Sequence, residues 1–330
     1  MTRLVAASPL QIAASQEPEQ IVETAGLMAD DTFPRGSRPK QWYVVAGSSK
    51  YPFLRGGHRY LFKESMQRSP VQYWSEIAAS EIGALAGVSV PPTYAAFDST
   101  RVVPGAFVEY FLQFPGGDPT ERFTHAVDHL QMLQRNFDTR RGTSHNLKAN
   151  LLLVRAFERR AGLVGGLDFF ARTLVFDALI GNTDRHQENW GFIWSEYNAR
   201  QRVRAAPAFD NGTSLGYELA EERLPDFTGN RLDRYVLRGT HHMRLEEGDA
   251  KKANHIEMCR FFGQQHPYAI PKMLSVLTFP EDHLRSRLER LVRFDMPARL
   301  SESRAEFMFR ATMRRRELLG NALMDLGTSS

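Results

Sequence analysis

The spacing of apolar and polar residues differs on either side of residue 115. Before it, aromatic and β-branched residues gather in short runs, which predict strands at 41–46, 58–65, 88–98 and 102–114. Residues 69–87 instead predict a helix, because Ser69 can cap it, Pro70 fits the first turn and Gly87 can end it. The turn-rich run "PGGDPT" then separates this part of the chain from the next.

After this turn cluster, apolar residues recur mostly at helical spacing. The predicted helices span 121–137, 148–162, 167–181, 252–264, 281–293 and 302–325. Two β-like pieces, 190–194 and 203–209, interrupt them. This order predicts an α+β chain of two lobes, the first sheet-rich and the second mainly helical. We therefore expect a helical or partly flexible lead-in at 1–30, an N-lobe at 31–115 and a C-lobe at 116–330.

Composition narrows the class of protein without naming a function. Of the 330 residues, 42% are hydrophobic and 24% charged, as in soluble globular proteins. Cys259 is the single cysteine, so no intramolecular disulfide is possible and a reducing compartment is expected. The sequence has no run of apolar residues long enough for a membrane span and lacks the long apolar core of a secretory signal, so we expect a cytoplasmic protein.

The net charge of +4 is mild, and the short arginine runs are typical of solvated helix faces. We therefore expect no direct contact with nucleic acid. A phosphate-bearing substrate would suit the same charge balance.

The run "LIGNTDRHQENWGF", 179–192, places a polar loop between two apolar segments. Asp184 and Asn189 lie on this loop, and Asp210 follows the two β-like pieces, in "PAFDNGTS". A hairpin between them can bring Asp210 back beside Asn189. Amide and carboxylate oxygens are ligands that suit Mg²⁺, and Asp184 could then orient an attacking hydroxyl near a triphosphate. The alternative is the ordinary preference of Asn and Asp for loops.

A lone lysine, Lys63, ends the apolar strand "RYLFKES". Strand alternation puts it on the same face as Leu61, where a half-buried charge needs a partner. The following helix offers Glu76 and Glu81, and Glu76 lies in an otherwise apolar stretch. The sequence therefore predicts a lysine–glutamate ion pair that places an ammonium group against phosphate oxygens. The alternative is an edge lysine that reaches solvent, with two surface glutamates.

Two weaker signals point to nucleotide contacts. Gly36, in "RGSRPK", precedes the first strand, and its backbone could approach a phosphate closely. Gly56 and Gly57, in "SSKYPFLRGGHR", compete for the same role. The strand end "FVEYF", 107–111, could offer its backbone to an adenine edge.

A cluster of histidines and the cysteine invites comparison with a zinc site. His241, His242, His255 and Cys259 lie close together in the sequence. Their spacing matches no familiar zinc motif, so we expect a polar loop there. Residues 226–250, which are rich in arginine, are not assigned to any role.

Taken together, these segments resemble the HipA-like kinases, bacterial relatives of the protein-kinase fold. The resemblance covers roughly residues 30–330 and rests on "GNTDRHQEN", "FDNGTS", "YLFKES", "EIAASEIGALAGVSVPP" and "GSRPK". The "DRHxxN" core is also similar to that of phosphatidylinositol 3- and 4-kinases. The resemblance implies a two-lobed protein-kinase-like fold and the use of ATP and Mg²⁺.

The resemblance also implies a role for each matched residue. Asp184 is the expected catalytic base, braced by hydrogen bonds from His186, and Asn189 and Asp210 are the expected Mg²⁺ ligands. The residues expected to contact ATP, or to position those that do, are Gly36 and Ser37 in the phosphate loop, Lys63 with its partner Glu76, and Glu109 and Phe111 at the hinge.

The implied activity is ATP- and Mg²⁺-dependent phosphoryl transfer to a protein serine or threonine. The family also implies a toxin role, an aminoacyl-tRNA synthetase or other translation factor as substrate, and a small antitoxin as partner. Two departures stand out: the lead-in before Gly36 is short, which suggests a short form of the family, and Thr32 rather than a serine precedes that glycine.

Two alternatives stay open at the level of sequence. One is a small-molecule or phosphatidylinositol-type lipid kinase, in which Arg140 and Arg141 could bind an acidic head group. The other is a catalytically silent regulator that keeps the kinase fold.

Overall fold

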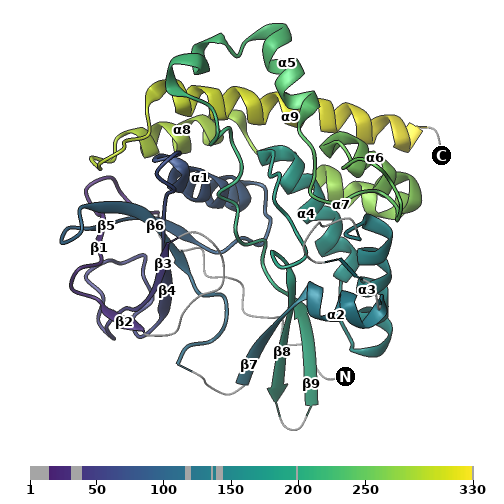
Figure 1. Ribbon diagram of the computed structural model, residues 1–330, viewed down its shortest axis with the longest axis horizontal. Helices are drawn as coiled ribbons and strands as arrows, with labels where there is room; N and C mark the ends of the chain where they lie inside the picture. The colour runs from purple at the N-terminus through teal and green to yellow at the C-terminus, as the bar shows by residue number, and fades with distance from the viewer. Residues whose placement is uncertain are drawn as a thin grey trace.

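The computed structural model describes residues 15–30, 39–115, 120–134, 137–138, 144–197 and 200–328. These residues form a sheet-rich lobe and a mainly helical lobe, as Figure 1 shows. The α+β, two-lobed fold predicted from the sequence is therefore confirmed.

The first lobe contains a six-stranded sheet in the order β1-β5-β6-β4-β3-β2. Its strands are β1 (Val22–Glu23), β2 (Met28–Asp30), β3 (Lys40–Val44), β4 (Arg59–Glu64), β5 (Thr93–Asp98) and β6 (Val103–Glu109). β1 pairs with β5 in parallel, and the other neighbours are antiparallel. Alternation places Tyr60 and Phe62 of β4 in a small apolar cluster on one face, whereas Leu61 packs against the larger core on the other.

The expectation of a helical or flexible lead-in is wrong for residues 15–30. These residues supply β1 and β2, one at each edge of the sheet. Strands of two and three residues are too short to show a periodic pattern. Their partners β5 and β3 provide the hydrogen bonds that define them.

Helix α1 (Gln72–Leu85) follows β4 and confirms the helix predicted over 69–87. Ser69 does not cap it. Instead the backbone N–H of Tyr73 donates to Oγ of Ser65, at the end of β4, at 2.9 Å. Gly87 follows the helix with a φ of +62°, a conformation that favours glycine.

The second lobe combines a three-stranded sheet, in the order β7-β8-β9, with the remaining helices. The strands are β7 (Thr120–His125), β8 (Gly191–Tyr197) and β9 (Arg200–Ala205). The α-helices are α2 (Ala126–Leu133), α3 (Leu147–Arg160), α4 (Gly166–Ile180), α5 (Gly229–Arg238), α6 (His255–Gln265), α7 (Ile270–Ser275), α8 (Glu281–Val292) and α9 (Glu302–Thr328), with short 3₁₀ helices at Glu221–Asp226 and Pro267–Ala269.

The helix predicted at 121–137 is wrong over its first five residues. β7 occupies Thr120–His125 and pairs with β8, and the helix begins only at Ala126. His125 closes a capping box with Asp128, which explains the abrupt change from strand to helix. The strand predicted at 203–209 also shifts toward the N-terminus, to Arg200–Ala205.

The main apolar core belongs mostly to the helical lobe but includes α1. Tyr73, Trp74 and Ile77 of α1 share it with α4 and with Phe294. Within the part of the chain that the structure describes, no helix combines the length and apolarity needed to cross a membrane.

Candidate active site

Lys63 is a buried charge with two carboxylate partners. Its side chain is 7% exposed, and its Nζ lies 2.7 Å from Oε2 of Glu76 on α1. The same Nζ lies 2.7 Å from Oδ1 of Asp210. The predicted lysine–glutamate pair is therefore present, and Asp210, distant in sequence, joins it. Glu81 is not the lysine's partner.

The backbone around Asp210 is held in a specific conformation. Asp210 has a φ of +59°, which is uncommon for a residue other than glycine but tolerated by aspartate. The next backbone N–H, of Asn211, donates to Oε1 of Glu76 at 2.9 Å. Glu76 thus binds the ammonium of Lys63 with one oxygen and the Asp210 loop with the other.

The loop after α4 folds back on itself by hydrogen bonds. Oδ1 of Asn182 accepts a bond from the backbone N–H of Asp184 at 3.0 Å. Nδ2 of Asn189 donates to the carbonyl of Asp184 at 2.7 Å. Nδ1 of His186 accepts a bond from the N–H of Glu188 at 3.2 Å. Asp184 and Asn189 are therefore brought together on one tight loop.

Arg185 joins this loop to the Asp210 segment, and the sequence analysis missed it. Its guanidinium donates to Asp177 of α4 through Nε at 3.0 Å and Nη2 at 2.7 Å. It also donates to the carbonyls of Asn189 and Phe209, and to Oδ1 of Asn211. Both neighbours of Asp210 are thereby fixed to the loop that carries Asp184.

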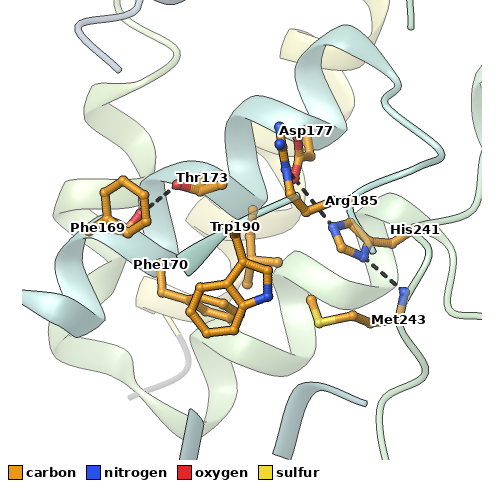
Figure 2. Close-up of a pocket in the computed structure, with 9 residues that line it drawn as sticks. Phe169, Phe170, Thr173, Asp177, Arg185, Trp190, His241 and Met243 are labelled. Carbon is orange, nitrogen blue, oxygen red and sulfur yellow. Dashed lines mark hydrogen bonds and ion pairs between the residues drawn. The ribbon is translucent and has the colours of Figure 1, made fainter. Parts of the chain in front are cut away.

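Asp177 is a fully buried carboxylate beneath the loop, and Figure 2 shows it facing Arg185 and His241. Burial alone would raise the pKa of this carboxyl, but the Arg185 guanidinium and His241 outweigh burial and hold the pKa below its usual range. The buried ion pair is therefore charged. A charge inside the apolar helix run "LVFDALI" is the sequence signal that could have identified it.

The predicted hinge residues differ in what their side chains do. The carboxylate of Glu109 is turned into the sheet lobe, where it accepts bonds from Arg55 at 3.1 Å and from the Tyr60 hydroxyl at 3.4 Å. Phe111 stacks on Phe209, with ring centroids 5.3 Å apart. An aromatic surface thus adjoins Asp210 directly.

Gly36 and Ser37 lie outside the described residues, as do Thr32, Arg140 and Arg141. Gly56 and Gly57 lie in the turn between β3 and β4. Among the described residues, no group of three or more His, Cys, Asp and Glu side chains is arranged to hold a metal ion.

The histidines noted in the sequence lie together with His145 beneath the candidate catalytic loop. His241 binds Asp177, with Nε2 3.4 Å from Oδ2. Nδ1 of His145 lies 3.2 Å from Nδ1 of His242. Burial lowers the pKa of His145, His242 and His255, so these imidazoles are neutral at physiological pH.

A two-lobed fold with a lysine–glutamate pair in one lobe and a polar loop in the other defines a kinase-like protein. The chain belongs to the HipA-like kinase family, because residues 34–294 match the family model of the HipA-like C-terminal domain. No curated protein matches the sequence.

Two of the solved structures that match the chain come from bacteria. The proinflammatory kinase CtkA of Helicobacter pylori is 17% identical, with a TM-score of 0.69, and the match covers 92% of this chain and 99% of CtkA. HipA of the Shewanella oneidensis MR-1 toxin–antitoxin system, solved with HipB and operator DNA, is 12% identical with a TM-score of 0.48, over 90% of this chain and 67% of that chain.

Proposed function

We propose that the protein is an ATP- and Mg²⁺-dependent kinase that phosphorylates serine or threonine hydroxyls of a protein. The observation that carries this proposal is the meeting of Lys63, Glu76 and Asp210 through two contacts of 2.7 Å. Family membership supports phosphoryl transfer as the reaction class.

Each residue then has a defined task. Lys63, positioned by Glu76, binds phosphate oxygens of ATP. Asp184 accepts the proton of the substrate hydroxyl. At the same time the hydroxyl oxygen bonds to the γ-phosphorus, and the bond between the γ-phosphorus and ADP breaks. Phe111 and Phe209 provide an apolar surface for the adenine ring, and His186 braces the loop.

The oxygens of Asn189 and Asp210 fit Mg²⁺, because an amide and a carboxylate form a small set of hard ligands. Asn189 uses its Nδ2 to bind the Asp184 carbonyl, and its amide oxygen makes no hydrogen bond among the described residues. Mg²⁺ would neutralise charge on the phosphates. Removing divalent cations with a chelator should therefore abolish turnover.

The decisive test compares Asp184→Ala with wild type in an assay of ATP turnover and autophosphorylation. We expect Asp184→Ala to lose at least about a hundredfold in rate while retaining ATP binding, since a catalytic base contributes about 10²–10⁴. Glu188→Gln, an exposed acid of the same loop, is the matched control and should stay active. Equal activity of Asp184→Ala and wild type would refute the assignment.

The class of substrate needs a separate measurement. Labelled phosphate transferred in a cell lysate should appear in the protein fraction, on serine and threonine. Appearance in the lipid fraction alone would instead identify a lipid kinase. ATP binding without any transfer would indicate a silent regulator.

We further propose that the protein acts as the toxin of a toxin–antitoxin pair, with a translation factor as substrate. Family membership alone supports this part of the proposal. Growth arrest on induction of wild type, but not of Asp184→Ala, would support it, and unchanged growth in both would contradict it.

A further inference from the structure

Helix α1 carries Glu76, and the first turn of this helix is attached to the C-terminal part of the chain. The Tyr73 hydroxyl donates to the carbonyls of Pro297 at 3.2 Å and Ala298 at 2.9 Å. Nε1 of Trp74 donates to the same Ala298 carbonyl at 2.9 Å. Ala298 has a φ of +54°, so the loop that presents this carbonyl adopts a conformation L-residues rarely take.

A second attachment lies beyond Glu76 on the same helix. Oε2 of Glu81 is 2.6 Å from Nη1 of Arg287, and its Oε1 is 2.6 Å from Nη2 of Arg290, both on α8. The Glu81 side chain is only 17% exposed and that of Arg290 13%. Solvent therefore screens the Glu81–Arg290 pair less than it screens pairs on an open surface.

Apolar packing joins the two attachments. The Trp74 ring meets Phe294 edge to face, with centroids 5.9 Å apart, and both side chains are fully buried. Gly83 packs so closely on Val90 and Phe176 that a methyl group there would collide with Val90. In Figure 1, α1 lies between α8 and strands β5 and β6 of the sheet. Its position is therefore set from the C-terminal side as well as from the sheet.

We propose that α8 and the loop through Ala298 are the positioning device of the nucleotide site, acting on Lys63 through α1 and Glu76. This inference rests on the proposed kinase function. Glu81, Tyr73 and Trp74 are then positioning residues: they contact no nucleotide, yet they fix the carboxylate that orients the lysine. A shift of Glu76 by about 1 Å would misplace Lys63 and the Asp210 loop together, because Glu76 binds both.

The test is a double-mutant cycle on ATP affinity, with wild type, Glu81→Gln, Glu76→Gln and the double variant. Glu81→Gln should weaken ATP binding about tenfold in the wild-type background and have little effect once Glu76 is gone, since coupled residues act non-additively. Tyr73→Phe, which removes only a hydroxyl, should act in the same direction and provides a milder change if Glu81→Gln folds poorly.

The control is Glu289→Gln, which removes an exposed glutamate from α8 and should leave ATP affinity unchanged. An equal loss from Glu81→Gln in both backgrounds would show a general structural effect and overturn the inference. Wild-type affinity in Glu81→Gln and Tyr73→Phe would overturn it as well. If wild type itself bound no ATP, the proposed function would fail instead, so the two failures are distinguishable.

Discussion

Lys63 shows how one buried ammonium can organise residues that are far apart in sequence. A charge this deep requires counter-charges, and Glu76 and Asp210 supply them from a helix and from a distant loop. Removing both carboxylates would leave the buried ammonium without a counter-charge. The ion pairs therefore favour the arrangement that the proposed phosphate-binding site needs.

Removing one partner of the buried Arg185–Asp177 pair should cost more stability than removing one partner of a surface ion pair. Arg185→Met leaves a buried carboxylate without its cation and should lower the free energy of unfolding by about 3–5 kcal/mol. Asp177→Leu combined with Arg185→Met should recover part of this loss but stay inactive, since the loop has lost its anchor. Urea unfolding and ATP turnover measure the two effects.

Arg299→Met is the matched control for this pair. Arg299 pairs with Asp295 in solvent, with side chains 66% and 82% exposed, so its loss should cost about 1 kcal/mol or less. Equal costs for Arg185→Met and Arg299→Met would contradict the structural role of Arg185.

The buried histidines predict a loss of stability in mild acid. Burial, reinforced by Lys252 and His186, lowers the pKa of His242 to about 3. Between this value and the usual pKa of about 6.5, the unfolded chain binds a proton that the folded chain does not, so stability falls as pH drops below about 6.5. His242→Gln should reduce the change in the free energy of unfolding with pH by up to about 1.4 kcal/mol per pH unit.

The measurement is urea unfolding of wild type and His242→Gln from about pH 7 to about pH 5. Parallel pH profiles for the two proteins would show that His242 does not take up a proton on unfolding.

Residue chemistry in the sequence predicted part of this site. A lone lysine in an apolar strand led to Glu76, because a buried charge implies a partner nearby. Arg185 was missed because one arginine in a polar loop looks solvated, and only the fold shows that it lies beneath the loop. His241 was likewise assigned to a polar loop, although its side chain is buried against Asp177.

At the scale of elements, the C-terminus of α4 leads directly into the candidate catalytic loop. Gly181 ends the helix with a φ of +66°, and a methyl group there would collide with the guanidinium of Arg315 on α9. The loop therefore begins where the backbone of α4 touches a buried side chain of α9.

Gly181→Ala should cost more stability than backbone strain alone explains. A left-handed conformation costs a residue other than glycine about 1–2 kcal/mol, and the collision with Arg315 adds to it. Gly162→Ala is the matched control, because Gly162 has a φ of +71° but no atom within 4 Å of the added methyl. Comparing the thermal unfolding of the two variants isolates the effect of the collision with Arg315. Equal decreases in Tm would argue against such an effect.

The longer elements followed the sequence pattern, whereas short strands, the polar helix α5 and the short helix α7 did not. Helices α3, α4, α8 and α9 lie where apolar spacing placed them. The residues of β7 were predicted as part of a helix because the strand that pairs with them, β8, comes about seventy residues later. α5 was missed because its apolar residues, Leu232 and Val236, are few among arginines and gain their packing from Phe307 of α9.

At the scale of the whole molecule, the candidate site joins the two lobes. Lys63 and Glu76 come from the first lobe and Asp210 from the second. The lobe boundary near residue 115 stays a prediction.

A nucleotide that contacts both lobes should stabilise the entire chain. At about a hundredfold excess over its dissociation constant, ATP with Mg²⁺ should add about 2.7 kcal/mol to the free energy of unfolding. Thermal unfolding with and without nucleotide checks this, with Lys63→Met as the variant expected to show a much smaller shift. A shift of the same size in Lys63→Met would exclude the lysine from binding.

The shared core of α1 and the helical lobe has a consequence for dissection of the protein. A fragment ending near residue 115 would carry Trp74 and Ile77 without the partners that bury them, and the remaining fragment would expose Phe294. Neither piece would be an autonomous folding unit, despite the two-lobed outline. The lobes should therefore melt together in a single cooperative transition, and exchange of lobes between relatives would succeed only if α1 travelled with the helices it packs against.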